Sequence, residues 1–384
     1  MDNKDKFVIS RNLISIQKYF GIGTQKAYDV YKAILNADAL NKDIRLVADK
    51  IDVSEQFKSV LSNLSYDFAL KTLGELKECG IKLMLISDPY FPERLGNIPQ
   101  PPLVIYYKGV FPPIDSLPAV TIVGPRKATQ FGMKSAYALG YRLSKAGFVI
   151  ISGGALGCDS YAHTGAIKAG GKTIAVLGCG LESDYLIKNK ELRMKIASSG
   201  CVISEYPPFQ GATKYTFPVR NRLMSALGLG TVVVEAGVKS GALITAGHAI
   251  EQGRDVFVIP GNPTLSQYKG SNLLLRDGAI PLLDASDIFN NYIVEYADKI
   301  DIEKAFEKDE NETKSDGSVK KSKKCPETLS KEAKIVYNYT DKQNFTADDL
   351  LNCGLSDDEI LSALTELEME QCIKALPGGA YDKI

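Results

Sequence analysis

Residues 119–159 read AVTIVGPRKATQFGMKSAYALGYRLSKAGFVIISGGALGCD, and this stretch decides the fold class. It contains two short apolar runs, at 120–123 and 148–151, with an amphipathic pattern over 133–146 between them. Short runs that are almost wholly apolar are typical of strands buried on both faces, and a helix between two of them indicates a parallel crossover. The stretch therefore predicts a β-α-β unit, and we expect its crossover to be right-handed.

The same alternation continues toward residue 259. Four further strands are predicted at 173–177, 201–204, 231–235 and 256–259, and a helix is predicted at 243–251. Repeated β-α units with continuous apolar strands favour an α/β fold, with a Rossmann-like, doubly wound and mostly parallel sheet.

Glycine and polar clusters follow four of these strands, at 124–129, 152–159, 178–180 and 235–242. Open α/β sheets bind ligands outside the carboxyl ends of their strands, where glycine lets backbone amides approach an anion. Arg126, Lys127 and Lys239 add positive charge to two of the clusters. Each cluster alone is also what a tight turn requires, but together they predict a phosphate-binding edge. GxxxxGK[ST] is absent and Gly124-Pro125-Arg126 interrupts GxGxxG, so we expect no ATP or NAD cofactor through those motifs.

The segment 204–222 combines prolines, aromatic residues and cations before a predicted helix start. Arg220 and Arg222 flank Asn221 there. The preceding loop contains Tyr206, Phe209, Lys214, Tyr215 and Phe217. Guanidinium groups bind phosphates and aromatic rings stack on unpaired bases, so the segment favours single-stranded nucleic acid as a ligand. Alternatively, the aromatic rings serve to anchor the loop to the core.

Evidence for catalysis is weak. GxSxG is absent, and Asp159 and His163 stand four residues apart on one predicted helix face without an evident nucleophile. A helix cap and a core or dimer-contact histidine are the favoured interpretations of this pair. Glu235, at a strand end, is either a general acid or base or a residue that orients loop amides.

The charge is unevenly distributed. Lys and Arg number 46, as do Asp and Glu, so a uniformly basic nucleic-acid-binding protein is excluded. Residues 119–289 contain 18 Lys and Arg against 11 Asp and Glu, whereas residues 327–384 contain 5 against 12. A role with nucleic acid must therefore depend on a local patch in the middle of the chain.

Four regions are predicted from these patterns. Residues 1–80 read as helical, with a Gly21-Ile22-Gly23 turn that suits a helix-hairpin-helix or a plain helical hairpin. Residues 81–290 form the sheet domain, and the charged residues 291–326 read as a flexible linker. Residues 327–384 have helical patterns at 330–339, 347–351 and 357–369 and short strands near 373–376 and Tyr381, which are the parts of a winged helix.

The seven cysteines are scattered and form no CxxC, and the start of the chain lacks a signal-peptide layout. Free thiols in a reducing cytoplasm follow. Two histidines argue against a zinc site, and the apolar runs are far shorter than the roughly 20 residues of a membrane span, so no membrane association is expected.

Over residues 81–283 the motifs and their order resemble the DprA/Smf family (DNA-processing protein A). The motifs are YFP (90–92), PPL (101–103), YKG (107–109), GPR (124–126), SG (152–153), GCD (157–159), AH (162–163), SEYP (204–207), FPVRNR (217–222), SGALITA (240–246), PG (260–261) and GSN (270–272). The resemblance implies a SAM-like domain in front, an extended Rossmann-like domain that binds single-stranded DNA and forms a homodimer, and a winged helix behind. It implies a cytoplasmic recombination mediator, not an enzyme, that protects incoming DNA and loads RecA during natural transformation.

The resemblance also implies a DNA-binding site. Its residues here are Gly124, Arg126, Lys127, Gly153, Gly154, Lys214, Arg220, Asn221, Arg222, Lys239, Ser240 and Gly241. Two positions depart from the family pattern: Pro125 stands where Ser is usual, and Leu156 where Arg is usual. One phosphate contact is therefore lost, or Lys127 replaces it.

The predicted winged helix is acidic, and two other functions remain open for the chain. The segment 357–370 contains six Asp and Glu and no Lys or Arg, so we expect it to contact protein or compete for the DNA site rather than bind duplex. A LOG-like nucleotide hydrolase would use Glu235 in catalysis, but its PGGxGTxxE motif is missing. An adaptor that has lost tight DNA binding is the third hypothesis.

Overall fold

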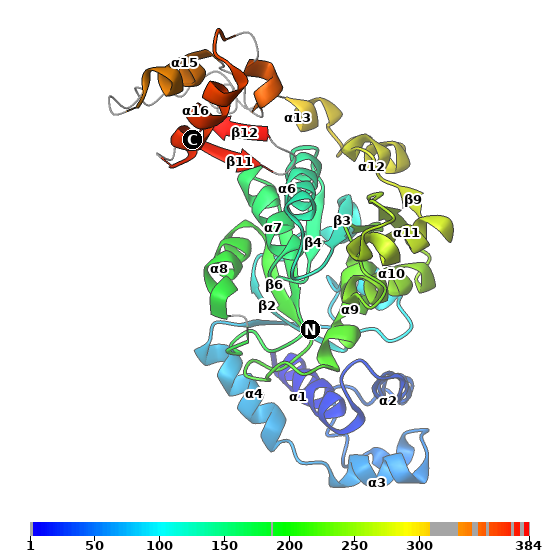
Figure 1. The fold of residues 1–384 in the computed structure, drawn as a ribbon. Coiled ribbons are helices and arrows are strands. Elements are labelled where there is room, and N and C mark those ends of the chain that lie inside the picture. Colours follow the sequence, from blue (N-terminus) through cyan, green and yellow to red (C-terminus); the bar gives the residue numbers. More distant parts are fainter. Residues whose placement is uncertain are drawn as a thin grey trace. The chain divides into compact units, whose positions relative to one another are not determined.

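The computed structural model describes residues 3–185, 187–307, 329–339, 345–350, 353–369, 372–376 and 380–383. They fall into two compact units, one that ends at Glu307 and one beyond it. Figure 1 shows both units.

A nine-stranded sheet forms the centre of the first unit. Its strands are β1 (Lys82–Leu85), β2 (Val104–Gly109), β3 (Ala119–Val123), β4 (Val149–Ser152), β5 (Thr173–Leu177), β6 (Cys201–Ser204), β7 (Gly230–Val233), β8 (Asp255–Val258) and β9 (Ile280–Pro281). Their order in the sheet is β1-β2-β6-β5-β4-β3-β7-β8-β9. The strands from β6 to β9 are parallel, and β2 and β1 are added antiparallel at one edge. The predicted doubly wound, mostly parallel sheet is confirmed.

The order of the strands creates a switch point beside β3. The chain runs from β3 through β4 and β5 to β6 on one side, then returns to place β7 on the other side of β3. Val120 is consequently paired with Ile150 of β4 and with Gly230 of β7. In such sheets a crevice opens outside the carboxyl ends of the strands at the switch point.

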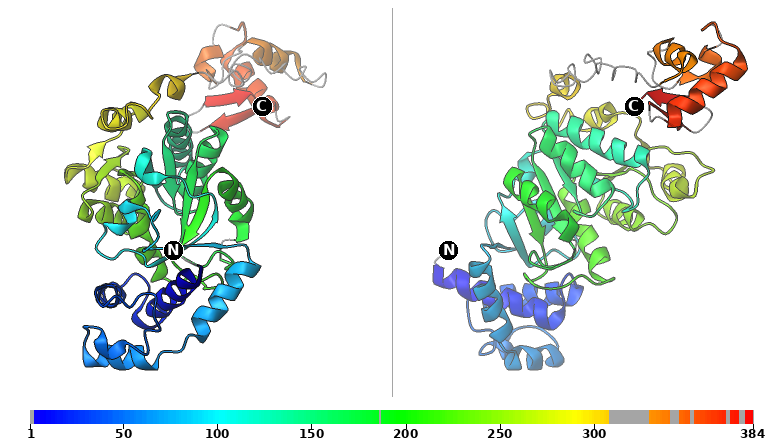
Figure 2. Two further views of the ribbon diagram at one scale, coloured as in Figure 1. Left: turned by 180° about the vertical axis from the view of Figure 1, so that it is seen from behind. Right: turned by 60° about the vertical axis from the view of Figure 1, so that its left-hand side comes forward.

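Helices cover both faces of the sheet (Figure 2). They are α5 (Glu93–Gly96), α6 (Gln130–Lys145), α7 (Cys158–Lys168), α8 (Lys190–Ser199), α9 (Thr216–Leu227), α10 (Gly241–Glu251), α11 (Lys269–Arg276), α12 (Ala285–Tyr292) and α13 (Ile302–Phe306). On one face Val120 and Ile122 pack with α6 and α7, and on the other Val123 packs with α9 and α10. Both faces are therefore buried, which explains the continuous apolar strands.

The N-terminal region is helical, as predicted. Its helices are α1 (Asn3–Phe20), α2 (Gln25–Asn36), α3 (Glu55–Asn63) and α4 (Asp67–Glu78). Gly21 and Gly23 take φ values of +100° and +66° in the turn between α1 and α2, a conformation that favours glycine. The core of these helices continues into Val104 and Tyr106 of β2, so packing fixes the helices against the edge of the sheet.

The segment expected as a linker, 291–326, differs from that expectation in its described part. Tyr296, Ile300 and Ala305 are buried in the core that also holds α6. Apolar residues spaced along 292–306 bring this stretch onto the sheet unit, although its charge suggested a tether. The rest of the expected linker, from residue 308 to 326, lies outside the described residues.

The second unit combines helices with a small sheet. Its elements are α15 (Lys331–Tyr339), β10 (Phe345–Thr346), the short helix η5 (Ala347–Leu350), α16 (Asp357–Met369), β11 (Ile373–Leu376) and β12 (Ala380–Lys383). The strand order is β10-β12-β11, and Val336, Phe345 and Leu364 belong to its core. The predicted parts of a winged helix are therefore present, and the predicted turn at 377–379 lies outside the described residues.

The described residues bear on the expectations about the cysteines and about membrane spans. Cys79, Cys158, Cys179, Cys201 and Cys353 are free thiols there, and Cys325 lies outside the described residues. In the part of the chain that the structure describes, no helix combines the length and apolar character that crossing a membrane requires.

Candidate nucleic-acid interface

A cleft of about 380 Å³ lies at the carboxyl ends of β3 and β7. We call it the switch-point cleft. Its lining includes six of the predicted DNA-binding residues: Gly124, Arg126, Arg220, Asn221, Ser240 and Gly241. Pro125, Asp159 and Phe217 also line it. The β3–α6 loop, the start of α9 and the start of α10 thus converge where a doubly wound sheet binds its ligands.

Arg126 is the exposed cation of this cleft. Its guanidinium carbon lies 4.8 Å from the centre of the Phe217 ring and 5.9 Å from that of Tyr185. A guanidinium over an aromatic face is attracted to the ring and keeps its N–H groups available at its edge. The rings therefore hold the Arg126 guanidinium in place while it stays accessible to a phosphate group.

Phe217 was not among the predicted site residues. The sequence signal for it was present, because Phe217 belongs to the group of aromatic residues before Arg220. Only the fold shows which of those rings supports Arg126.

Arg220 lies in the floor of the cleft and is buried. Its Nη1 donates to the carbonyl of Gly153 at 2.9 Å and to that of Val176, and its Nε donates to Asn221 Oδ1 at 3.1 Å. Burial lowers the pKa of Arg220, and the nearby Asp159 carboxylate opposes this effect. Arg220 therefore holds the ends of β4 and β5 together while placing positive charge beneath the cleft.

The structure does not bring Arg222 to the cleft. Two residues along an α-helix turn about 200°, so Arg222 points away from the side that carries Arg220. It is buried and forms an ion pair with Glu205 at 2.5 Å. Burial raises the pKa of Glu205, and the Arg222 guanidinium opposes that rise. A Cβ at Gly23 would lie 2.5 Å from Arg222 Nη2, which places Arg222 beneath the helical region.

The predicted lysines are exposed around the site. Lys127 and Lys239 belong to the loops that follow β3 and β7, and neither lines the cleft itself. Lys214 Nζ lies 5.0 Å from the centre of the Tyr215 ring, in the loop before α9. These lysines add charge to the same edge of the sheet without forming part of its walls.

The predicted glycines have steric roles. Gly153 is packed against Arg220 and Asp159, each 2.7 Å from where its Cβ would be, and Gly154 has a φ of +64°. Ser240 caps α10 by accepting a hydrogen bond from the amide of Ala242 at 3.3 Å. These residues shape the loops whose backbone surrounds the cleft.

Glu235 and His163 are both engaged within the fold. The Glu235 carboxylate accepts from the Thr129 amide at 2.6 Å and from the Thr129 hydroxyl at 3.0 Å. Glu235 is fully buried and so fixes the loop that carries Arg126. His163 Nδ1 lies 2.7 Å from Thr173 Oγ1, and burial lowers its pKa to about 3. Of the two interpretations of each residue, the structure favours loop positioning for Glu235 and a core position for His163.

The two departures from the family pattern are exposed to different degrees. Pro125 lines the cleft, and its carbonyl accepts from the amide of Cys158 at 3.4 Å. Leu156 is 40% exposed in the loop after β4. Neither position supplies a polar side chain to the cleft.

Two family models match the chain. The model described as DNA recombination-mediator protein A matches residues 82–293, and the model described as DprA winged helix domain matches residues 320–379. The first covers more than half of the chain and includes every residue of the switch-point cleft.

Relatives of similar sequence carry matching names. The chain is 38% identical over 219 residues to Protein Smf of Synechocystis sp., covering 56% of this chain and 55% of that protein. It is 37% identical over 220 residues to DNA processing protein DprA of Bacillus subtilis, covering 57% and 74%. The match therefore spans about half the length of the Synechocystis protein.

Solved structures agree with these names. DprA from Streptococcus pneumoniae superposes with a TM-score of 0.63 at 29% identity, covering 73% of this chain and 97% of that one. DprA from Helicobacter pylori, solved to explain its single-stranded DNA binding mode, has a TM-score of 0.51 at 29% identity and covers 56% and 97%. Sequence motifs, fold and family models agree, and this chain belongs to the DNA recombination-mediator protein A (DprA/Smf) family.

Proposed function

We propose that this chain binds single-stranded DNA through the switch-point cleft. The observation that carries the proposal is the seating of Arg126 on Phe217 above the buried charge of Arg220, where β3 and β7 end. A guanidinium beside a partly exposed aromatic ring suits a sugar–phosphate backbone with unpaired bases. The Helicobacter pylori relative, for which single-stranded DNA binding is described, supports the same ligand.

The wider role is part of this proposal. The chain would act in the cytoplasm as a homodimeric recombination mediator that protects incoming DNA and loads RecA during natural transformation. Membership in the family supports this role. A gel shift of an oligonucleotide with and without RecA tests it: a RecA-containing complex that forms only with this protein is expected. RecA binding that is the same with and without the protein would contradict it.

We further propose that the protein acts by binding and not by catalysis. The supporting observation is Glu235, the carboxylate that a LOG-like hydrolase would need, because both of its oxygens accept hydrogen bonds from Thr129. Incubation with nucleoside monophosphates should release no free base. Base release that Glu235→Gln abolishes would instead support the hydrolase.

Fluorescence anisotropy of a labelled oligonucleotide at several salt concentrations tests the DNA-binding site. With three or four phosphates neutralised, the slope of log K against log salt should be roughly −2 to −3. Arg126→Ala should weaken binding and reduce the steepness of that slope by about 0.7. Arg142, which is partly exposed in the last turn of α6, is the matched control, because that turn lies at the opposite end of the helix from the cleft. Equal losses in Arg126→Ala and Arg142→Ala would refute the site.

A further inference from the structure

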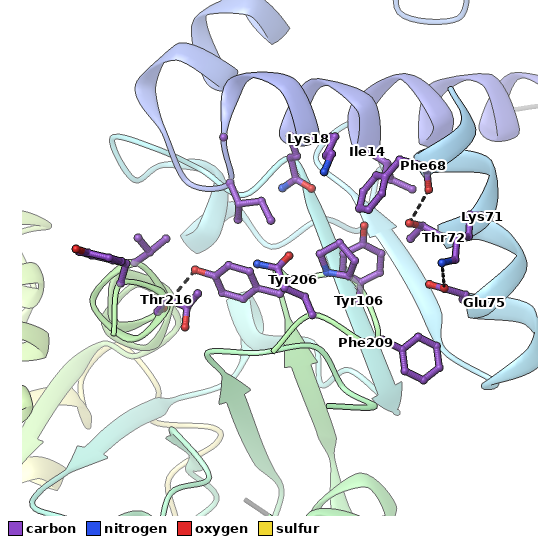
Figure 3. Close-up of a pocket in the computed structure, with 17 residues that line it drawn as sticks. Ile14, Lys18, Phe68, Lys71, Thr72, Glu75, Tyr106, Tyr206, Phe209 and Thr216 are labelled. Atoms are coloured by element: carbon purple, nitrogen blue, oxygen red, sulfur yellow. Dashed lines mark hydrogen bonds and ion pairs between the residues drawn. The ribbon is translucent and has the colours of Figure 1, made fainter. Parts of the chain in front are cut away.

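A second cavity, of about 700 Å³, lies on the other side of α9 from the switch-point cleft. Figure 3 shows it between α1 above, α4 at the right and the loop from β6 to α9 below. We call it the aromatic pocket. The rings that line it are Phe68, Tyr106, Tyr206, Phe209 and Tyr215. None of these residues belongs to the site proposed above.

The first turn of α9 separates the two cavities. Thr216 and Val219 line the aromatic pocket, while Phe217 and Arg220 line the switch-point cleft. Neighbouring positions on a helix point about 100° apart, so one turn presents a side to each cavity. An α-helix is roughly 10 Å wide with its side chains, so a strand that crosses the start of α9 can reach both cavities.

The entrance of the aromatic pocket offers flat apolar surface and positive charge. Phe209 and Tyr215 are 56% and 71% exposed, so large aromatic faces are open to solvent there. Lys18 Nζ lies 4.7 Å from the centre of the Phe68 ring, and Lys71 Nζ lies 3.8 Å from Glu75 Oε1. Interleaved lysines and aromatic rings are the features that bind the backbone and the bases of a single strand.

Deep in the pocket are two buried polar groups that have no hydrogen-bond partner among the described residues. Tyr106 is fully buried and Gln17 is 4% exposed. Among the residues that the structure describes, neither Tyr106 Oη nor Gln17 Nε2 has a hydrogen-bond partner. A buried donor without a partner is costly, and both groups line this pocket. These two donors are complementary to a ligand that carries hydrogen-bond acceptors on a flat ring.

We infer that the aromatic pocket accepts an unstacked nucleobase from the single strand held in the switch-point cleft. This inference rests on the proposed function. Stacking on the rings replaces the base stacking lost from the strand, and a ring carbonyl accepts from Tyr106 or Gln17. Lys18 attracts a flanking phosphate, whereas Lys71 is paired with Glu75, which also lines the pocket. The protein thereby holds a base out of the stack beside its main phosphate site.

Photocrosslinking with an oligonucleotide that contains 4-thiothymine tests the path of the strand in the full chain. Adducts are expected on α4 or in the loop around Phe209, in addition to adducts near Arg126. If the wild-type protein binds the oligonucleotide but all adducts lie near Arg126, the inference fails and the proposed function stands. If the wild-type protein does not bind at all, the proposed function itself fails.

Two variants test the chemistry of the pocket. Phe209→Ala changes an exposed ring and should weaken oligonucleotide binding about fivefold or more, with an unchanged salt slope. Tyr106→Phe should weaken it without lowering the thermal midpoint, because the hydroxyl that it removes has no partner in the described residues. Tyr141→Phe is the matched control, since the Tyr141 hydroxyl is likewise buried and has no partner in the described part of the chain, but lies outside both cavities.

A further comparison distinguishes a base that belongs to a DNA strand from a free nucleotide. Thymidine monophosphate should bind far more weakly than the oligonucleotide and should not prevent the adducts on α4. Tight binding of the mononucleotide, lost in Tyr106→Phe and retained in Arg126→Ala, would identify a site for a free nucleotide and overturn the inference. Unchanged oligonucleotide affinity in both Phe209→Ala and Tyr106→Phe would overturn it as well.

Discussion

The guanidinium of Arg126 rests on the ring of Phe217, with 4.8 Å between the guanidinium carbon and the ring centre. Arg126 comes from the loop after β3 and Phe217 from the first turn of α9, so the contact joins segments about ninety positions apart in the chain. Phe217 thereby limits the positions that the long, flexible side chain of Arg126 can take. The cleft is organised around this pair.

Phe217 should matter for DNA affinity without contributing charge. Phe217→Leu keeps an apolar side chain but removes the aromatic face, so Arg126 loses its support and the DNA loses a stacking surface. We expect a loss of about 1 kcal/mol or more in binding, with the salt slope unchanged. Anisotropy at several salt concentrations measures both quantities. A reduced slope would show that Phe217 acts through phosphate contacts.

Arg222 should matter for stability and not for contact with DNA. Its ion pair with Glu205 is buried, and removing one partner leaves an uncompensated charge. Arg222→Met should therefore lower the free energy of unfolding by about 3–5 kcal/mol. Adding Glu205→Leu should restore much of the loss, because the remaining charge is then removed too. Urea unfolding measures this, and full stability combined with lost DNA affinity would contradict it.

His163 should make stability depend on pH. Burial lowers its pKa from the ordinary 6.5 to about 3, so between these values the unfolded chain binds a proton that the folded chain does not. Stability should therefore fall as pH drops below 6.5, by up to about 1.4 kcal/mol per pH unit from this group. His163→Gln should show a shallower fall of the thermal midpoint between pH 6.5 and 4.5. Parallel curves for the two proteins would be evidence against the assignment.

The acidic helix α16 should not bind duplex DNA. Asp358 and Glu368 are exposed, and Glu366 is occupied by the Ser330 amide and hydroxyl at 2.7 and 2.6 Å. These hydrogen bonds lower the pKa of Glu366 and keep it charged. A photocrosslinker placed at position 358 should give no adduct with duplex. Asp358→Lys combined with Glu368→Lys should raise the affinity for duplex, measured by gel shift. A duplex adduct from the crosslinker at position 358, with the rest of the chain unchanged, would overturn the expectation.

The sequence by itself predicted the six strands from β3 to β8, because each of them is a continuous apolar run buried on both faces of the sheet. The predicted strand at 173–177 matches β5 (Thr173–Leu177), and the one at 201–204 matches β6. Strands β1, β2 and β9 were not predicted. The partly polar run of β2 pairs antiparallel with β1 and β6, and such pairing depends on distant segments.

The sequence also predicted three of the loops that form the cleft, those after β3, β4 and β7, since the carboxyl ends of parallel strands meet at one edge. The fourth predicted cluster, at 178–180, does not line it. Only the tertiary structure decided the roles of the two arginines of FPVRNR. Because of the helical rotation, Arg220 faces the cleft and Arg222 faces Glu205. The turn at Gly23 in the N-terminal helical region covers Arg222. A local pattern specifies residue types and spacing, but the neighbours that pair with a charge or exclude water from it come from elsewhere in the chain.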